Sequence, residues 1–228
     1  MIPWLQIDSA QVPGADVELR LMRRGAEFSM MLGPNELMNS RLSGSEEALA
    51  TLACKRIEKV RRPHVLIGGL GMGFTLRATL KVLGDEAWIV VAELLPAVIA
   101  WARGPMADLF GDSLGDPRTV IRHADVIDVI QSSASAFDAV LLDVDNGPEG
   151  LTRQANDALY DLKGLKAICR ALRPHGVLAV WSSGPNASFS TRLGSAGFEV
   201  NEVGVRATAK RSGAHHVIWF ATKPGGAG

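Results

Sequence analysis

Apolar and polar residues follow two different rhythms along this chain, and the two rhythms predict its architecture. Near the N-terminus, residues 17–23 and 27–32 alternate with a period of about two on either side of Arg24-Gly25-Ala26, which predicts a β-hairpin. From Pro63 onward, short apolar runs alternate with stretches in which apolar residues recur every three or four positions. Strands that alternate with helices in this way favour a mostly parallel sheet with helices on both faces.

The elements expected after Pro63 share this order of a strand followed by a helix. The expected strands are 65–67, 88–93, 119–122, 137–143 and 177–181, and the expected helices are 74–83, one beginning near Pro96, 126–131, 156–172 and 187–194, with residues 173–176 as a turn. An earlier helix runs from Ser45, its expected N-cap, to about Val60. Strands 198–205 and 216–222 lie too close together for a parallel crossover, so they predict an antiparallel hairpin.

Composition narrows the classes of function. The 228 residues suit one domain with a small appendage, and 24 basic residues balance 24 acidic ones, so no strong field favours nucleic acid or a membrane. No signal peptide is apparent, and no apolar stretch is long enough to span a bilayer. Cys54 and Cys169 fit small core residues in a reducing compartment, and the histidines, including His215-His216, lack the spacing of metal ligands. We expect a cytoplasmic protein without a metal.

A glycine-rich turn follows the first strand of the expected parallel sheet. The pattern Gly69-x-Gly71-x-Gly73 lets the backbone turn tightly and approach a ligand, and the helix that follows offers unpaired N–H groups to it. Ligands of open α/β sheets bind at this carboxyl edge. Position 74 is Phe, so the pattern is not G-x-G-x-x-G, which disfavours a nicotinamide or flavin dinucleotide.

Acidic residues follow three other strands at the same edge. Glu93 suits the two hydroxyls of a ribose, or is an exposed strand-end acid. Asp125 suits an adenine amino group, caps the helix that begins at Val126, or does both. Asp143 opens an acidic turn with Asn146, which suits an amine acceptor whose proton Asp143 takes, although turn chemistry alone also explains these residue types.

These motifs in this order resemble the spermidine synthase family, within the class I S-adenosylmethionine-dependent methyltransferase fold. The resemblance rests on residues 65–80, 90–98, 122–125, 137–148 and 159–176, and the hairpin and the helix after Ser45 resemble the family's N-terminal portion. It implies an α/β fold with a mostly parallel, seven-stranded, Rossmann-like sheet and an antiparallel C-terminal hairpin. A small β-hairpin segment, residues 1–44, would precede the S-adenosylmethionine-binding domain, residues 45–228.

The resemblance also implies roles for individual residues. Glu93 would bind ribose, Asp125 would contact adenine, and Asp143 would be the acid on the acceptor side. The cofactor-binding residues expected on this basis are Gly69, Gly71, Gly73, Glu93, Leu94, Asp125, Val126 and Asp143, and the expected catalytic residues are Asp143 and Asn146.

Two departures from the family's motifs bear on the group that is transferred. The family's glycine loop usually reads G-G-G-D-G-G, and here Gly71 or Met72 stands in the region of the acid; its acceptor loop usually reads D-x-x-D-P, and here the second acid falls on Asn146 and the proline comes later, at Pro148. Each departure removes a negative charge expected to hold a cationic chain.

We therefore expect a transferase that moves a methyl group from S-adenosylmethionine to a small-molecule acceptor, and we expect this acceptor to be an amine. The alternative is aminopropyl transfer from decarboxylated S-adenosylmethionine, as in polyamine synthesis. An alternative of another class is a catalytically idle relative that keeps the nucleoside pocket. We expect neither nucleic acid nor a membrane as a partner. The sequence is compatible with a homodimer but does not define the oligomeric state.

Overall fold

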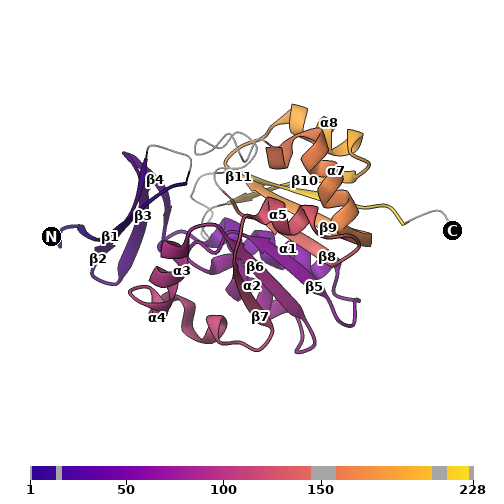
Figure 1. Ribbon diagram of the computed structural model, residues 1–228. Coiled ribbons are helices and arrows are strands. Elements are labelled where there is room, and N and C mark those ends of the chain that lie inside the picture. Colours follow the sequence, from indigo (N-terminus) through magenta and orange to yellow (C-terminus); the bar gives the residue numbers. More distant parts are fainter. Residues whose placement is uncertain (1, 14–16, 145–157, 207–214, 226–228) are drawn as a thin grey trace.

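The computed structural model describes residues 2–13, 17–144, 158–206 and 215–225, which form two sheets (Figure 1). The first sheet is antiparallel with strands in chain order: β1 (Leu5–Gln11), β2 (Glu18–Arg24), β3 (Glu27–Leu32) and β4 (Asn35–Asn39). The predicted hairpin is its central pair, β2 and β3. The structure adds a strand on each side of that hairpin.

The second sheet has seven strands in the order β10-β11-β9-β8-β5-β6-β7. Their bounds are β5 (His64–Gly68), β6 (Trp88–Glu93), β7 (Thr119–His123), β8 (Phe137–Leu142), β9 (Leu172–Ser182), β10 (Glu199–Arg206) and β11 (His215–Thr222). Strands β5 to β9 are parallel, and β11 pairs antiparallel with both β9 and β10, as predicted. The chain leaves β5 toward β6 and later returns to the other side of β5 with β8, which creates the switch point where ligands of such sheets bind.

Helices cover both faces of the second sheet. They are α1 (Gly44–Arg56), α2 (Phe74–Val82), α3 (Pro96–Arg103), α4 (Ala107–Phe110), the 3₁₀ helix η1 (Gly111–Leu114), α5 (Val126–Gln131), α7 (Leu162–Ala171) and α8 (Ala187–Ser195). Buried residues of α1 to α4 form one core cluster with the sheet, and those of α5, α7 and α8 form a second. Among the described residues, no helix is long and apolar enough to cross a membrane.

Three predicted elements differ from the structure. Helix α1 begins at Gly44 and ends at Arg56, four residues before Val60, and its N-cap position is Ser43, so Ser45 lies inside the first turn. The turn predicted at residues 173–176 belongs to β9, whose register against β8 shifts there. An ion pair of 2.7 Å between Arg173 and Asp138 fixes this irregular stretch. The helix predicted at residues 156–172 is interrupted at Asp161, which is the N-cap of α7 (Leu162–Ala171). Helices α4 and η1 lack a predicted counterpart.

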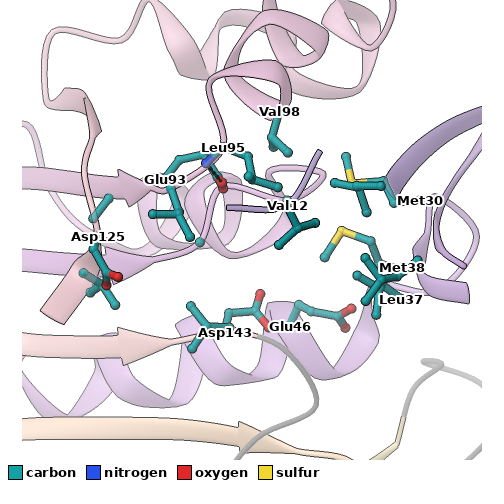
Figure 2. Close-up of a pocket in the computed structure, with 18 of the residues that line it drawn as sticks. Val12, Met30, Leu37, Met38, Glu46, Glu93, Leu95, Val98, Asp125 and Asp143 are labelled. Atoms are coloured by element: carbon teal, nitrogen blue, oxygen red, sulfur yellow. Dashed lines mark hydrogen bonds between the residues drawn. The ribbon is translucent and has the colours of Figure 1, made fainter. Parts of the chain in front are cut away.

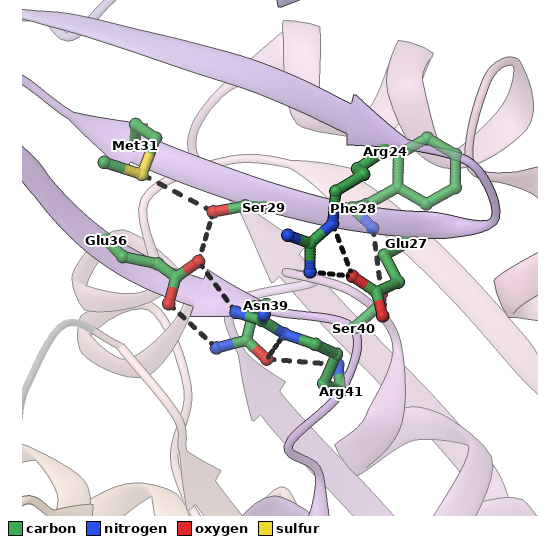
Figure 3. Close-up of polar contacts among 9 residues, drawn as sticks. All are labelled: Arg24, Glu27, Phe28, Ser29, Met31, Glu36, Asn39, Ser40 and Arg41. Atoms are coloured by element: carbon green, nitrogen blue, oxygen red, sulfur yellow. Dashed lines mark hydrogen bonds and ion pairs between the residues drawn. The ribbon is translucent and has the colours of Figure 1, made fainter. Parts of the chain in front are cut away.

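The first sheet and the helices α1 to α4 share one apolar core, because buried side chains of β2 and β3 belong to the same cluster as those of these helices. A polar network lies on the other side of β3 and β4 (Figure 3). The Ser29 hydroxyl donates to Glu36 at 2.6 Å, and Glu36 also accepts from Asn39 at 3.0 Å and pairs with Arg41 at 3.5 Å. The network locks β3 to β4.

The boundary predicted between the N-terminal segment, residues 1–44, and the domain that follows, residues 45–228, stays a prediction.

Candidate functional site

A pocket lies between the carboxyl edge of the parallel sheet and the first sheet (Figure 2). Its lining residues come from both parts of the chain: Val12, Leu19, Met30, Leu32, Leu37, Met38, Glu46, Gly69, Gly71, Ala92, Glu93, Leu94, Leu95, Val98, Asp125, Val126, Asp143, Val144 and Trp181. Seven of the eight residues predicted to bind the cofactor are among them, and Gly73 is not. The strand exits therefore meet at one place, as the topology rule requires.

The glycine loop has the backbone geometry that its residues predict. Gly69, Gly71 and Gly73 have φ angles of 90°, 49° and 77°, a region that residues with a Cβ rarely adopt. A Cβ on Gly69 would lie 2.8 Å from the carbonyl oxygen of Asp143, so the loop passes directly beside the exit of β8. Gly73 is the N-cap of α2 and lies against the buried Phe110 ring, which explains its absence from the pocket.

Glu93 ends β6 with only 7% of its surface exposed, so the interpretation as an exposed strand-end acid is wrong. One carboxylate oxygen accepts from the backbone N–H of Leu70 at 2.9 Å, and the other accepts from that of Leu95 at 2.8 Å. Burial raises the pKa of Glu93, and these backbone donors counteract the rise. The backbone N–H groups of Gly71 and Leu94 also stabilise the ionised carboxylate, which lines the pocket.

Asp125 has the capping role that its position predicts. It is the N-cap of α5, and its Oδ1 accepts from the backbone N–H of Ile127 at 3.0 Å. The same side chain lines the pocket at the end opposite the first sheet (Figure 2), beside Val126. Capping uses one oxygen, so the other can accept from a ligand. Contact with adenine stays a prediction.

Asp143 follows β8 and reaches the floor of the pocket (Figure 2). Its Oδ2 accepts from the Thr75 hydroxyl at 2.7 Å, which fixes the orientation of the carboxyl group. Burial and, to a smaller extent, the nearby charge of Glu46 raise the pKa of Asp143, the Thr75 hydrogen bond lowers it, and the net result is a pKa of about 7. A carboxyl group with this pKa can take up and release a proton near neutral pH. Asn146, the other predicted catalytic residue, lies outside the described residues.

Glu46 is a pocket acid that the sequence analysis did not assign to the site. It lies in the first turn of α1, and its carboxylate lies beside that of Asp143 (Figure 2). The Ser45 hydroxyl donates to Glu46 Oε2 at 2.7 Å. Burial raises the pKa of Glu46, and the hydrogen bond from Ser45 lowers it. The stretch Ser45-Glu46-Glu47 gives a helix-start signal, which does not distinguish an acid that faces a pocket from one that faces solvent.

The pocket is apolar at the end formed by the first sheet (Figure 2). Met30 and Met38 pair directly across β3 and β4, on the face opposite the polar network of Figure 3. Met38 packs against the glycine loop, because a Cβ on Gly71 would lie 2.9 Å from its methyl carbon. The sequence predicted this sheet in part but did not predict that it closes the site.

The charge of the pocket is one-sided among the described residues. Its lining includes four carboxylates, those of Glu46, Glu93, Asp125 and Asp143, and no lysine, arginine or histidine. Neither residue in the region of the family's glycine-loop acid adds a charge, because Gly71 lines the pocket without a side chain and Met72 is 2% exposed and lies in the core. Such a lining favours a cationic ligand.

Comparisons with known proteins identify the relatives of this chain. No model of a known protein family matches it. It is 34% identical to polyamine aminopropyltransferase 1 of Streptomyces coelicolor over 128 residues, and 32% identical to polyamine aminopropyltransferase of Mycobacterium tuberculosis over 124 residues. These matches cover 54% and 53% of this chain but 23% of each relative, so the chain matches about a quarter of the length of its curated relatives.

Solved structures share the fold over nearly the whole chain. Spermidine synthase from Thermotoga maritima matches 96% of this chain and 72% of its own with a TM-score of 0.76 and 20% identity. A spermidine synthase in complex with the transition-state analogue AdoDATO gives a TM-score of 0.75 at the same identity and coverage. A probable spermidine synthase from Corynebacterium glutamicum gives 0.64 at 14% identity, over 94% of this chain and 79% of its own.

The fold is therefore the class I methyltransferase-like fold in the form found in spermidine synthases, and the predicted fold class is confirmed. The predicted resemblance to the spermidine synthase family is confirmed as well, in fold over nearly the whole chain and in sequence over about half of it. The relatives are aminopropyltransferases by name, which supports the aminopropyl alternative better than the methyl transfer that the sequence analysis preferred.

Proposed function

We propose that this chain transfers an aminopropyl group from decarboxylated S-adenosylmethionine to an amine acceptor. The acidic lining of the pocket is the observation that carries the proposal. Decarboxylated S-adenosylmethionine carries a sulfonium and an ammonium but no carboxylate, so all its charges are attracted to the four acids. The intact donor would bring its carboxylate into a pocket whose described lining has no cationic side chain.

Glu46 removes one of the two reasons for preferring methyl transfer. That preference rested on a glycine loop without an acid to hold the amine of the aminopropyl group, and on Asn146 in place of the second acid of the acceptor loop. Helix α1 brings Glu46 beside Asp143 instead, so an acid from a distant part of the chain reaches the same pocket. The names of the sequence relatives support the same choice.

Each acid has a place in the proposed reaction. The sulfonium makes the carbon next to it an electrophile. Glu93 and Asp125 bind the ribose and the adenine, beside the glycine loop. Glu46 binds the ammonium of the aminopropyl group, and Asp143 takes the proton from the acceptor's ammonium. The freed amine then attacks the carbon, the N–C bond forms, and the C–S bond breaks with its electron pair on sulfur. The residues mainly align the reactants and remove a proton.

Calorimetry and a product assay test the proposal together. We expect decarboxylated S-adenosylmethionine to bind at least about tenfold more tightly than methylthioadenosine, which lacks both the ammonium and the sulfonium charge, because ion pairs with desolvated carboxylates strengthen binding. We expect the intact donor to bind more weakly than the decarboxylated one. Aminopropyl transfer to a panel of amines, followed by mass spectrometry, identifies the product. Methylated products, or tighter binding of the intact donor, would overturn the proposal.

A further inference from the structure

A chain of hydrogen bonds connects Glu46 to a histidine behind the pocket. His216 Nδ1 lies 3.0 Å from the Ser45 hydroxyl oxygen, and that hydroxyl donates to Glu46 Oε2 at 2.7 Å. A hydroxyl has a single proton, so when Ser45 donates to Glu46 its oxygen must accept from His216. This requirement assigns the proton to Nδ1 in the neutral ring. Ser45 is 1% exposed, so water does not readily replace either partner.

Strand β11 fixes the histidine in place. The His216 ring meets the Trp181 ring edge to face, with 4.8 Å between the ring centres, and Trp181 itself lines the pocket. Burial lowers the pKa of His216. The neighbouring residue His215 points to the other face of the strand, and it lies opposite Arg206 of β10 in the antiparallel register.

The titratable groups on this side of the pocket are few among the described residues. Glu46 and its neighbour Glu47 lie on α1, and Asp143 lies at the end of β8. The charge of Glu47 raises the pKa of Glu46, and the charge of Glu46 raises that of Asp143. Two hydrogen bonds among the described residues lower the pKa of Glu46 and so favour its ionised form. One comes from a backbone N–H, and the other comes from the Ser45 side chain.

We propose that His216 is a positioning residue that acts through Ser45 to keep the Glu46 carboxylate ionised and directed at the donor's ammonium. This inference rests on the proposed function. By donating to the Ser45 oxygen, His216 leaves the hydroxyl proton for Glu46, and successive hydrogen bonds polarise one another. A second proton on the ring would place a cation at the end of the same chain and favour the carboxylate still more.

Two substitutions of His216 separate its ring from its hydrogen bond. His216→Phe keeps a ring against Trp181 and removes the donor, whereas His216→Asn keeps an amide donor near the position of Nδ1 and loses the ring. Ser45→Ala breaks the chain in the middle, and Glu46→Gln removes the charge. Calorimetry compares binding of decarboxylated S-adenosylmethionine with binding of methylthioadenosine, a neutral nucleoside that lacks both the aminopropyl group and the sulfonium charge.

We expect His216→Phe and Ser45→Ala to weaken binding of the decarboxylated donor by about five- to twentyfold, since a hydrogen bond to a charged group is at stake. Glu46→Gln should weaken it by about ten- to a hundredfold. All of these variants should bind methylthioadenosine within about twofold of the wild type, because Glu93 and Asp125 are intact. His216→Asn should retain most of the donor affinity, and equal losses in His216→Asn and His216→Phe would overturn the inference.

A second measurement needs no ligand. The carboxyl carbon resonance of Glu46, titrated by NMR, should give a higher pKa in Ser45→Ala and His216→Phe than in the wild type, because the lost hydrogen bond favours the carboxylate. An unchanged Glu46 pKa with unchanged donor affinity would overturn the inference while the wild type's preference for the decarboxylated donor stands. A wild type that does not prefer this donor over methylthioadenosine would overturn the proposed function, and this inference with it.

Discussion

The two halves of the pocket differ in how the chain builds them. The sheet-edge half consists of the glycine loop, Glu93 and Asp125, each located within a residue or two of the end of a parallel strand. The N-terminal half consists of Glu46 from α1 and apolar side chains from the first sheet, including Met30 and Met38. Local sequence builds the first half, and tertiary packing builds the second. In our proposal the first half binds the nucleoside, and the second selects the transferred group and the acceptor.

Asp143 lies where the two halves meet, and its substitution should have the largest effect. Asp143→Asn keeps the shape and an oxygen for the Thr75 hydroxyl. It removes the base, so turnover with an amine acceptor should fall by about 10²–10⁴-fold, while affinity for methylthioadenosine stays within about twofold. Steady-state kinetics and calorimetry measure the two effects. The exposed acid Asp108 provides a control as Asp108→Asn, which should leave both unchanged. Undiminished turnover would exclude Asp143 as the base.

The pKa of Asp143 predicts a pH dependence with a definite sign. Burial and the charge of Glu46 raise this pKa to about 7, whereas an aspartate in an unfolded chain has a pKa near 3.9. Between about pH 4 and 7 the folded state holds the proton more tightly, so its stability should fall as the pH rises through this window and level off above it. Turnover should rise through the same pH range. Thermal denaturation should give a flatter pH profile for Asp143→Asn.

The sequence predicted most of the fold and the sheet-edge half of the pocket, because strand periodicity and residues at strand ends are local signals. Trp88–Glu93 and Val126–Gln131 have the bounds that the sequence predicts. Glu46 was not assigned to the pocket, because its pattern describes the start of a helix and not the direction in which that start faces. The contact of Met38 with the pocket could not be predicted either, because Met38 lies in the first sheet and Gly71 in the glycine loop, and no local sequence pattern shows that these two segments meet.

Gly69 tests how rigidly the sheet-edge half is built. Its φ of 90° disfavours alanine, and a Cβ would lie 2.8 Å from the Asp143 carbonyl oxygen. Gly69→Ala should lower the free energy of unfolding by about 2–4 kcal/mol through strain and overpacking. Gly197 provides a matched control, because it has a similar positive φ of 96° but no atom within 4 Å of an added Cβ. Gly197→Ala should cost about 1–2 kcal/mol. Denaturant unfolding measures both, and equal losses would contradict the steric argument.

Glu93 tests whether this half binds the nucleoside. In Glu93→Gln, the amide group would point N–H bonds at the backbone N–H of Leu70 or Leu95. The site then loses both a charge and an acceptor, and affinity for methylthioadenosine should fall by about ten- to a hundredfold. Glu86→Gln is the control, because Glu86 is an exposed acid paired with surface arginines. Calorimetry with methylthioadenosine measures the affinity under conditions where both variants are folded. An unchanged affinity would mean that Glu93 only stabilises the glycine loop and does not bind the nucleoside.

Met38 should have the smallest effect, and that effect should be confined to the N-terminal half. Its side chain covers Gly71 at the apolar end of the pocket, so Met38→Ala enlarges the space beside the glycine loop. Affinity for methylthioadenosine should change by less than about twofold, while KM for the acceptor should rise by about two- to fivefold as apolar contact is lost. Met31→Ala is the matched control, because Met31 follows Met30 on the same strand and contacts Ser29 in the polar network instead.

A series of amines with increasing apolar bulk sharpens the comparison. In Met38→Ala the enlarged pocket accommodates larger side groups, so the ratio of the variant's KM to the wild type's KM should be lowest for the bulkiest amine. If Met38→Ala lowers the affinity for methylthioadenosine by as much as it raises KM for the acceptor, the two halves of the pocket do not bind the nucleoside and the acceptor separately.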